Sequence, residues 1–307
     1  MTLPLELEPE NPAVVYRDSL SRGSYWAVRH SLETIAGILG GEGADPWTFP
    51  WERLTYQHTA RVRRAIVERY APATVNKMLS ALRGVLKTAW RLGLMDAETY
   101  GRAIAVENVK ARVQPKGRAV EQDELAVLFR VCAEDESPAG RRDAALFAVL
   151  YGAGLRRAEL CGLDLVDFDA LDCALTVRAG KGRRDRTVYL PAAVCRHLCA
   201  WVEVREGEPG PLFCPVRSTG EVPITRLRGE VVWYILKRRQ KQAGLEGITP
   251  HALRRSYVTN LLAAGVDLLT VQELVGHADA VTTAKYDRRG DRTKRQATRA
   301  LRLPALD

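Results

Sequence analysis

Hydrophobic side chains recur at helical spacing through the first third of the chain. One apolar face runs from Tyr25 to Leu39 and ends at Gly40-Gly41, and a second helix is predicted over about 57–70. A third apolar face, from Val75 to Ala89, is the cleanest of the three and ends at Gly93. The pattern therefore predicts a helical unit in this part of the chain.

The opposite side of the third predicted helix is polar and basic. Its residues at helical spacing are Asn76, Ser80, Arg83, Lys87 and Arg91. A basic helix face is often only solvated, but residues 51–118 carry fourteen basic and five acidic side chains, a net charge of +9. This local charge favours a polyanion as partner, and we predict that the five residues contact phosphate groups.

Residues 109–118 (VKARVQPKGR) combine basic residues with proline and glycine and have no periodicity, which indicates an exposed linker between domains at 1–108 and 119–307. Beyond the linker, alternating segments at 173–178 and 186–190 flank AGKGRRD and predict a β-hairpin with a basic, glycine-rich turn. Helical patterns are predicted near 121–133, 142–151, 192–204, 226–243 and 268–275.

Composition agrees with a folded protein of two domains. The chain has 307 residues, of which 46% are hydrophobic and 27% charged, and its mean hydropathy is −0.19. No apolar run reaches the ~20 residues that a membrane helix needs, and the N-terminus lacks the basic start and apolar core of a signal peptide. We therefore expect a cytoplasmic protein with no membrane partner, whose six cysteines are reduced thiols.

The segment TPHALR at 249–254 has the composition of a helix start that binds an anion. Thr249 is a suitable N-cap and Pro250 suits the first helical position, so His251 and Arg254 fall on one face of the opening turn. The free N–H groups and the dipole of a helix N-terminus favour a phosphate there. Taken alone the pattern is weak, because such pairs are common on solvated helices.

Other candidate groups lie in the second domain, and all but the tyrosine among them belong to glycine-containing segments. These are Arg156, Lys181, His277 and Tyr286, with Arg183 and Arg184 in the same basic turn as Lys181. Each has an ordinary explanation on its own. A cation beside a glycine turn can be solvated, a histidine at a helix end can bond a carbonyl group, and most tyrosines belong to cores or interfaces. The order of these residues along the chain favours a functional role over these ordinary explanations.

The contexts GAGLRRAEL, GKGRRDR, HALRRSYVT, LVGHADA and TTAKY occur in an order that resembles the tyrosine recombinase (phage integrase) family, in its simple Xer-like two-domain form. The likeness is specific for residues 119–286 and weaker for 20–105. It implies a mainly α, DNA-breaking-rejoining architecture. A helical core DNA-binding domain and a mostly helical catalytic domain with a small antiparallel sheet would clamp duplex DNA, with no metal and no other cofactor.

The resemblance also implies a site. Its catalytic residues are Arg156, Lys181, His251, Arg254, His277 and Tyr286. The tyrosine would form a 3′-phosphotyrosine and free a 5′-hydroxyl, while the two arginines hold the nonbridging oxygens. The lysine would protonate the leaving oxygen. His251 would assist proton transfer, and His277 would hydrogen-bond the phosphate. Arg183, Arg184 and the basic helix face would bind DNA.

Several further expectations follow from the same resemblance. A tetramer of this chain would exchange strands between two duplexes with short core sites, and the basic tail after Tyr286 would dock onto a neighbouring protomer or remain free. A second recombinase or a directionality factor is an open additional partner. A type IB topoisomerase-like enzyme and a non-catalytic DNA-binding protein on the same fold are the alternatives. Tyr257, the rival nucleophile, is assigned to the core by its apolar context.

Overall fold

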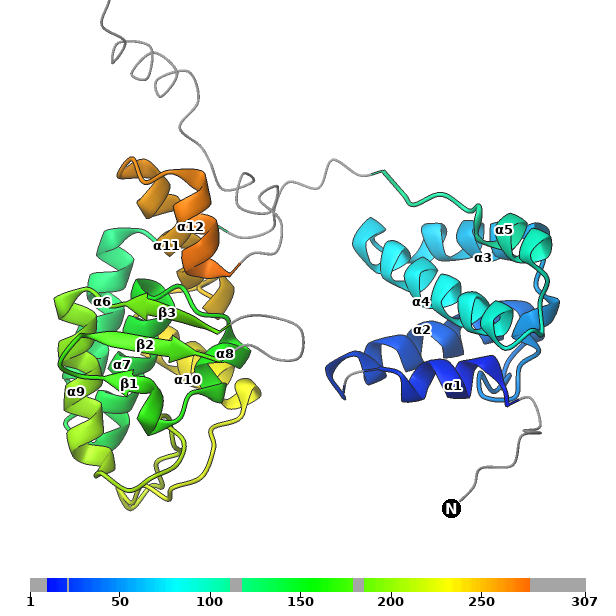
Figure 1. Ribbon diagram of the computed structural model, residues 1–307. Coiled ribbons are helices and arrows are strands. Elements are labelled where there is room, and N and C mark those ends of the chain that lie inside the picture. The colour runs from blue at the N-terminus through cyan, green and yellow to red at the C-terminus, as the bar shows by residue number, and fades with distance from the viewer. Residues whose placement is uncertain (1–9, 21, 111–117, 179–184, 277–307) are drawn as a thin grey trace, which may run out of the picture. The chain divides into compact units, whose positions relative to one another are not determined.

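The computed structural model describes residues 10–20, 22–110, 118–178 and 185–276, and it divides the chain into two compact units, Met1–Gln114 and Pro115–Asp307 (Figure 1). Most of the predicted linker lies outside the described residues, so the predicted domain limits stay a prediction. Each unit has its own hydrophobic core and is described by itself.

Helices make up the regular structure of the first unit in its described part. They are α1 (Pro12–Asp18), α2 (Arg22–Gly40), the 3₁₀ helix η1 (Trp51–Arg53), α3 (Tyr56–Arg69), α4 (Pro72–Arg91) and α5 (Ala97–Ile104). The helices α2, α3 and α4 confirm the three predicted from periodicity, and the apolar face of α4 is buried as expected. The remaining elements are too short to give a clear periodic signal.

Helix α4 is the centre of this unit, because α1, α2, α3 and α5 all pack against it. Gly84 permits the close approach of α1. A Cβ atom at Gly84 would lie 2.3 Å from Cζ of Tyr16, far inside van der Waals contact, so a larger residue would push the two helices apart.

Two residues on the polar face of α4 bind the protein's own chain. Asn76 donates to the carbonyl oxygen of Val109 at 3.1 Å and accepts from its N–H at 2.8 Å. Arg83 donates to Oδ1 of Asn108 at 3.0 Å and to the carbonyl oxygen of Val106. These side chains therefore fasten the segment after α5 to α4, a structural role that the pattern of one helix does not reveal. The other three, Ser80, Lys87 and Arg91, are exposed.

The second unit combines helices with a small sheet. Its elements are α6 (Gln122–Ala133), α7 (Pro138–Gly152), α8 (Arg157–Gly162), the 3₁₀ helix η2 (Leu165–Asp167), β1 (Phe168–Asp169), β2 (Ala174–Val177), β3 (Arg186–Tyr189), α9 (Ala192–Arg205), α10 (Gly229–Gln242), α11 (Pro250–Ala263) and α12 (Leu268–Val275). The strands are antiparallel in the order β1-β2-β3, with Leu175 opposite Val188 (Figure 1). The predicted hairpin and helices are confirmed, so the fold is mainly α with a small antiparallel sheet.

Helix α7 runs through the core of the second unit and is buried over most of its length. It packs against α6, α9, α10 and α11, which explains its nearly continuous apolar sequence. Neither α7 nor any other helix among the described residues is long and apolar enough to cross a membrane.

The cysteines depart from the sequence prediction. Cys173, just before β2, forms a disulfide with Cys195 of α9, and their Cα atoms are 5.7 Å apart, within the usual range for such a bond. The pair is separated by 22 residues and links the start of the hairpin to α9. The other four cysteines are free, in agreement with the prediction.

A buried ion-pair network joins α7 to α10, and breaking it should destabilise this unit. Asp143 is fully buried and accepts hydrogen bonds from Arg142 and Arg239, whose side chains are 5% and 2% exposed. Asp143→Ala leaves both guanidinium groups without this carboxylate, so we expect the free energy of unfolding to fall by about 3–5 kcal/mol. Denaturant titration of the full chain measures the change.

The control for this prediction is Glu221→Ala. Glu221 pairs with Arg217 at the surface, where both side chains are more than half exposed, and its loss should cost at most about 1 kcal/mol. Equal effects of the two substitutions would contradict the predicted role of the buried network.

Candidate active site

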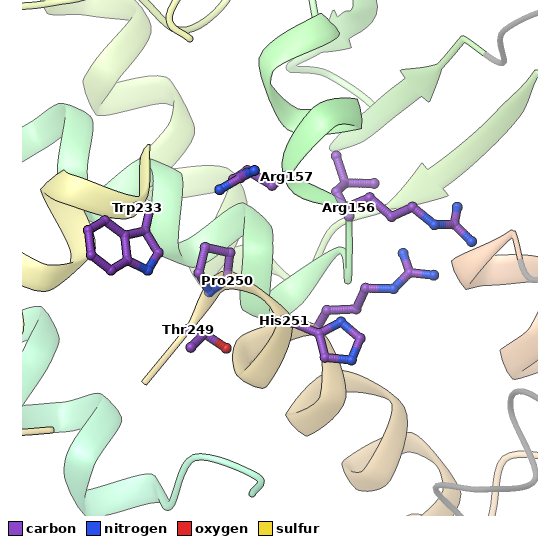
Figure 2. Close-up of a pocket in the computed structure, with 8 residues that line it drawn as sticks. Arg156, Arg157, Trp233, Thr249, Pro250 and His251 are labelled. Atoms are coloured by element: carbon purple, nitrogen blue, oxygen red, sulfur yellow. The ribbon is translucent and has the colours of Figure 1, made fainter. Parts of the chain in front are cut away.

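The first turn of α11 has the structure that the TPHALR segment predicts. Thr249 is the N-cap, and its hydroxyl oxygen accepts a hydrogen bond from the N–H of Ala252 at 3.0 Å. This helix start borders a cavity of about 260 Å³, lined by three of the predicted catalytic residues, Arg156, His251 and Arg254. Its other lining residues are Leu155, Arg157, Trp233, Thr249 and Pro250. Figure 2 shows Arg156 and His251 together with Arg157, Trp233, Thr249 and Pro250 in a close-up of the cavity.

Arg156 reaches the cavity from the turn between α7 and α8. Gly154 in this turn has a φ of +60°, and a Cβ atom there would lie 2.3 Å from Cδ1 of Tyr257, so both the backbone and the packed ring require glycine. Tyr257 packs against a small hydrophobic cluster of α11 and α12, and burial raises the pKa of its hydroxyl. Tyr257 is thus half-buried against this cluster, which is in keeping with a packing role.

One carboxylate, missed by the sequence analysis, organises the arginines. Oε1 of Glu159 accepts from Arg156 at 2.7 Å, both Glu159 oxygens accept from Arg186 at 3.2 and 3.0 Å, and Oε2 lies 3.7 Å from Nη1 of Arg254. Burial would raise the pKa of Glu159, but the hydrogen bonds from Arg186 and Arg156 outweigh it and the pKa is lowered. Glu159 is therefore a charged carboxylate shared by three guanidinium groups.

The same three arginines hold the end of α12. Arg186 Nε donates to the carbonyl oxygen of Leu274 at 3.1 Å, and Arg254 Nη2 to that of Val275 at 2.8 Å. Arg156 Nη2 donates to the carbonyl oxygen of Gly276 at 2.8 Å. The last carbonyl groups of a helix lack partners within the helix and carry the negative end of its dipole, so cations are well placed there.

The electrostatics of the cavity suit an anion. Arg254 is 5% exposed and also donates to the carbonyl oxygen of Gly154 at 2.5 Å, so its guanidinium is held rigidly. Part of His251 faces solvent, but the protein around its ring desolvates it and lowers its pKa, and the charges of Arg255 and Arg254 lower it further. His251 is accordingly a neutral imidazole at neutral pH, able to accept a proton.

The structure does not describe the other residues predicted for the second domain. Lys181, Arg183, Arg184, His277 and Tyr286 lie outside the described residues, so their roles stay predictions. By sequence, Lys181 belongs to the segment joining β2 to β3, and His277 directly follows Gly276. Among the described residues, no cluster of three or more histidine, cysteine or acidic side chains is arranged to hold a metal ion.

Glu159 and Arg186 were not among the predicted site residues, and only Glu159 has a recognisable pattern in the sequence. Glu159 follows Arg156 by three residues and accepts from the N–H of Arg156 at 2.8 Å, which is the capping-box position at the start of α8. The spacing alone could have indicated it. Arg186 gave no signal, because it is one of several arginines around the hairpin turn and only the fold selects it.

Comparison with known proteins shows which family and which fold the chain resembles. Residues 118–292 match the phage integrase family. The tyrosine recombinase XerA of Thermococcus onnurineus (strain NA1) is 33% identical over 236 residues, which cover 76% of each chain. Two solved structures share the fold. The Tn1549 transposon integrase in complex with a circular intermediate DNA matches with a TM-score of 0.69 and 16% identity, covering 95% of this chain and 100% of that one. A lambda integrase dimer bound to a COC′ core site matches with a TM-score of 0.67 and 18% identity, covering 96% of each chain.

Proposed function

Because the chain belongs to the phage integrase family and is a site-specific tyrosine recombinase, we propose that it cuts and rejoins duplex DNA through a covalent 3′-phosphotyrosine intermediate. The observation that carries this mechanism is the convergence of Arg156, Arg254 and His251 on one cavity at the start of α11. Two fixed cations and a neutral imidazole are the groups that transfer of a phosphodiester to an alcohol requires.

In the proposed cleavage step, one ester bond to phosphorus replaces another. The phenolic oxygen of Tyr286 bonds to the scissile phosphorus as the bond from phosphorus to the 5′-oxygen breaks. The phenolic proton leaves with the help of His251, and Lys181 protonates the departing 5′-oxygen. Rejoining reverses the step with the 5′-hydroxyl of another strand. The ester bond to tyrosine conserves the energy of the broken bond, so no nucleotide is consumed.

Charge at the site supports this chemistry. The three guanidinium groups around Glu159 and its one carboxylate carry a net charge of +2, and the exposed Arg157 adds a further positive charge to the cavity wall. A phosphodiester carries one negative charge and gains a second in its pentacovalent transition state, so the site gains attraction as the reaction proceeds. We propose that Arg156 and Arg254 supply this stabilisation and that the reaction needs no metal ion.

The partner of the site is duplex DNA, and we propose a tetramer on two duplexes with short core sites as the reactive assembly. The solved Tn1549 and lambda integrases are DNA complexes by their own descriptions, which supports DNA as the partner. In the first unit, the exposed Ser80, Lys87 and Arg91 of α4 are proposed to contact the phosphate backbone.

A trapping experiment tests the function. The full chain first enriches a binding sequence from a random pool of duplexes, and nicked versions of this selected duplex then trap the intermediate, because the short strand beside the nick diffuses away. We expect a protein–DNA adduct that resists detergent and forms equally well with excess EDTA. No adduct on any nicked version, or one that needs added metal, would contradict the proposed mechanism.

The lowered pKa of His251 predicts the pH dependence of this reaction. An imidazole accepts a proton only when neutral, so the rate should fall on the acid side with a midpoint below 6.5, the ordinary value for histidine. His251→Gln should remove this acid limb and slow adduct formation by about 10²–10⁴-fold. Single-turnover rates on the nicked selected duplex between pH 5 and 8 test both points. An unchanged acid limb in His251→Gln would assign it to another group.

A further inference from the structure

Arg186 contacts the candidate active site without lining its cavity. It is the first residue of β3, and its side chain is 16% exposed. Two of its nitrogens donate to the two carboxylate oxygens of Glu159, and the third donates to the carbonyl oxygen of Leu274. One side chain therefore connects the hairpin, the start of α8 and the end of α12.

Both partners of Arg186 also bind the arginines proposed to hold the phosphate. Glu159 accepts from Arg156 and lies 3.7 Å from Arg254. Leu274 provides the first of three consecutive carbonyl groups, and the next two accept from Arg254 and Arg156. A shift of Glu159 or of the end of α12 would consequently move both guanidinium groups.

The turn after α12 is shaped around Arg186. Gly276 has a φ of +60°, and a Cβ atom there would lie 3.0 Å from Nη1 of Arg186. The guanidinium thus packs directly against the turn that precedes His277 in the sequence. A planar fork with three well-separated N–H directions fits this set of acceptors, whereas the ammonium group of lysine is a single point charge.

We propose that Arg186 is a positioning residue of strand cleavage. It orients Glu159 and the end of α12, so that the guanidinium groups of Arg156 and Arg254 keep their places at the cavity, and it does not itself contact the scissile phosphate. This inference rests on the proposed function. It predicts that loss of Arg186 impairs the stabilisation of charge on the phosphate and leaves DNA affinity nearly intact.

The test compares Arg186→Gln, Arg186→Lys and the control Arg178→Gln in the full chain. Arg178 lies at the other end of the hairpin turn, pairs with Asp167 and does not line the cavity. On the nicked selected duplex, Arg186→Gln should form adduct roughly 10²-fold more slowly than the wild-type protein, the scale on which misplaced catalytic groups act. Arg186→Lys should recover part of the rate, and Arg178→Gln should keep the wild-type rate.

A second substrate separates positioning from general damage. In a methylphosphonate duplex, one nonbridging oxygen of the scissile group is replaced by methyl, so the group is neutral and the guanidinium charges contribute less. The defect of Arg186→Gln should shrink to under about 10-fold on this substrate. Thermal unfolding and DNA binding, measured alongside, should match those of Arg178→Gln.

The possible outcomes separate failure of the positioning role of Arg186 from failure of the proposed cleavage mechanism. A wild-type protein that forms no adduct would overturn both. An active wild-type protein with Arg186→Gln equally fast, or equally impaired on charged and neutral substrates, would overturn only the positioning role. Weak DNA binding by Arg186→Gln would also overturn it, because that result indicates a direct phosphate contact.

Discussion

Replacing Tyr286 by phenylalanine is expected to abolish the covalent protein–DNA adduct. The substitution removes only the phenolic oxygen, which the proposed mechanism uses as the nucleophile, so the cleavage rate should fall by about 10⁴-fold or more. The affinity for the selected duplex should stay nearly unchanged, because the cations that bind the phosphates remain. Detergent gels of the nicked duplex reaction and a parallel binding assay measure the two quantities.

The rival nucleophile provides the matched control. Tyr257→Phe keeps the ring that packs over Gly154 and removes only the hydroxyl, whose pKa burial already raises. This variant should form adduct at close to the wild-type rate. Trypsin digestion of the wild-type adduct should place the DNA on a peptide that contains Tyr286. Adduct formation by Tyr286→Phe, or its loss in Tyr257→Phe, would refute the assignment.

Local signals in the sequence predicted the anion-binding helix start. Thr249, Pro250, His251 and Arg254 lie within six residues, and a cap, a first-turn proline and an i,i+3 pair are decided by short-range backbone geometry. The helices α2, α3 and α4 could likewise be predicted, because their periodic apolar faces are long enough to be clear.

What the sequence could not predict depends on contacts between distant segments. Arg186 meets Glu159 across 27 residues and the carbonyl oxygen of Leu274 across 88, so neither contact leaves a local pattern. The disulfide between Cys173 and Cys195 has the same origin. The bonds of Asn76 and Arg83 to the segment after α5 likewise join residues more than 20 positions apart, so the pattern of α4 alone does not reveal them.

The contacts of the arginines clarify how a site with this much positive charge is stable before DNA binds. Each of the three guanidinium groups donates a hydrogen bond to a carbonyl group at the end of α12, where the helix dipole is negative, and Glu159 is their shared carboxylate. These fixed partners hold the cations in place, so little reorganisation is required when a phosphate enters. Such preorganisation is where electrostatic catalysis gains most of its effect.

Arg254→Lys is expected to slow adduct formation by about 10²–10³-fold, the usual cost of removing one preorganised donor to a developing charge. Lysine keeps the positive charge but loses the planar fork. The guanidinium donates to the carbonyl oxygens of Gly154 and Val275 through two different nitrogens, from a side chain that is 5% exposed, and the single nitrogen of an ammonium group cannot occupy both positions. DNA affinity should change little, which a binding assay on the selected duplex verifies.

The neighbouring Arg157 gives the sharpest comparison, since it lines the same cavity from the first position of α8 and is exposed. Arg157→Lys makes the same chemical change at an adjacent residue of the cavity wall, but it breaks no contact with Glu159 or with α12. Its rate should stay within a few-fold of wild type, the range expected for an exposed cation. If the two substitutions slow cleavage equally, the cavity requires only positive charge. The rigid hydrogen-bonded geometry of Arg254 would then not be the source of its effect.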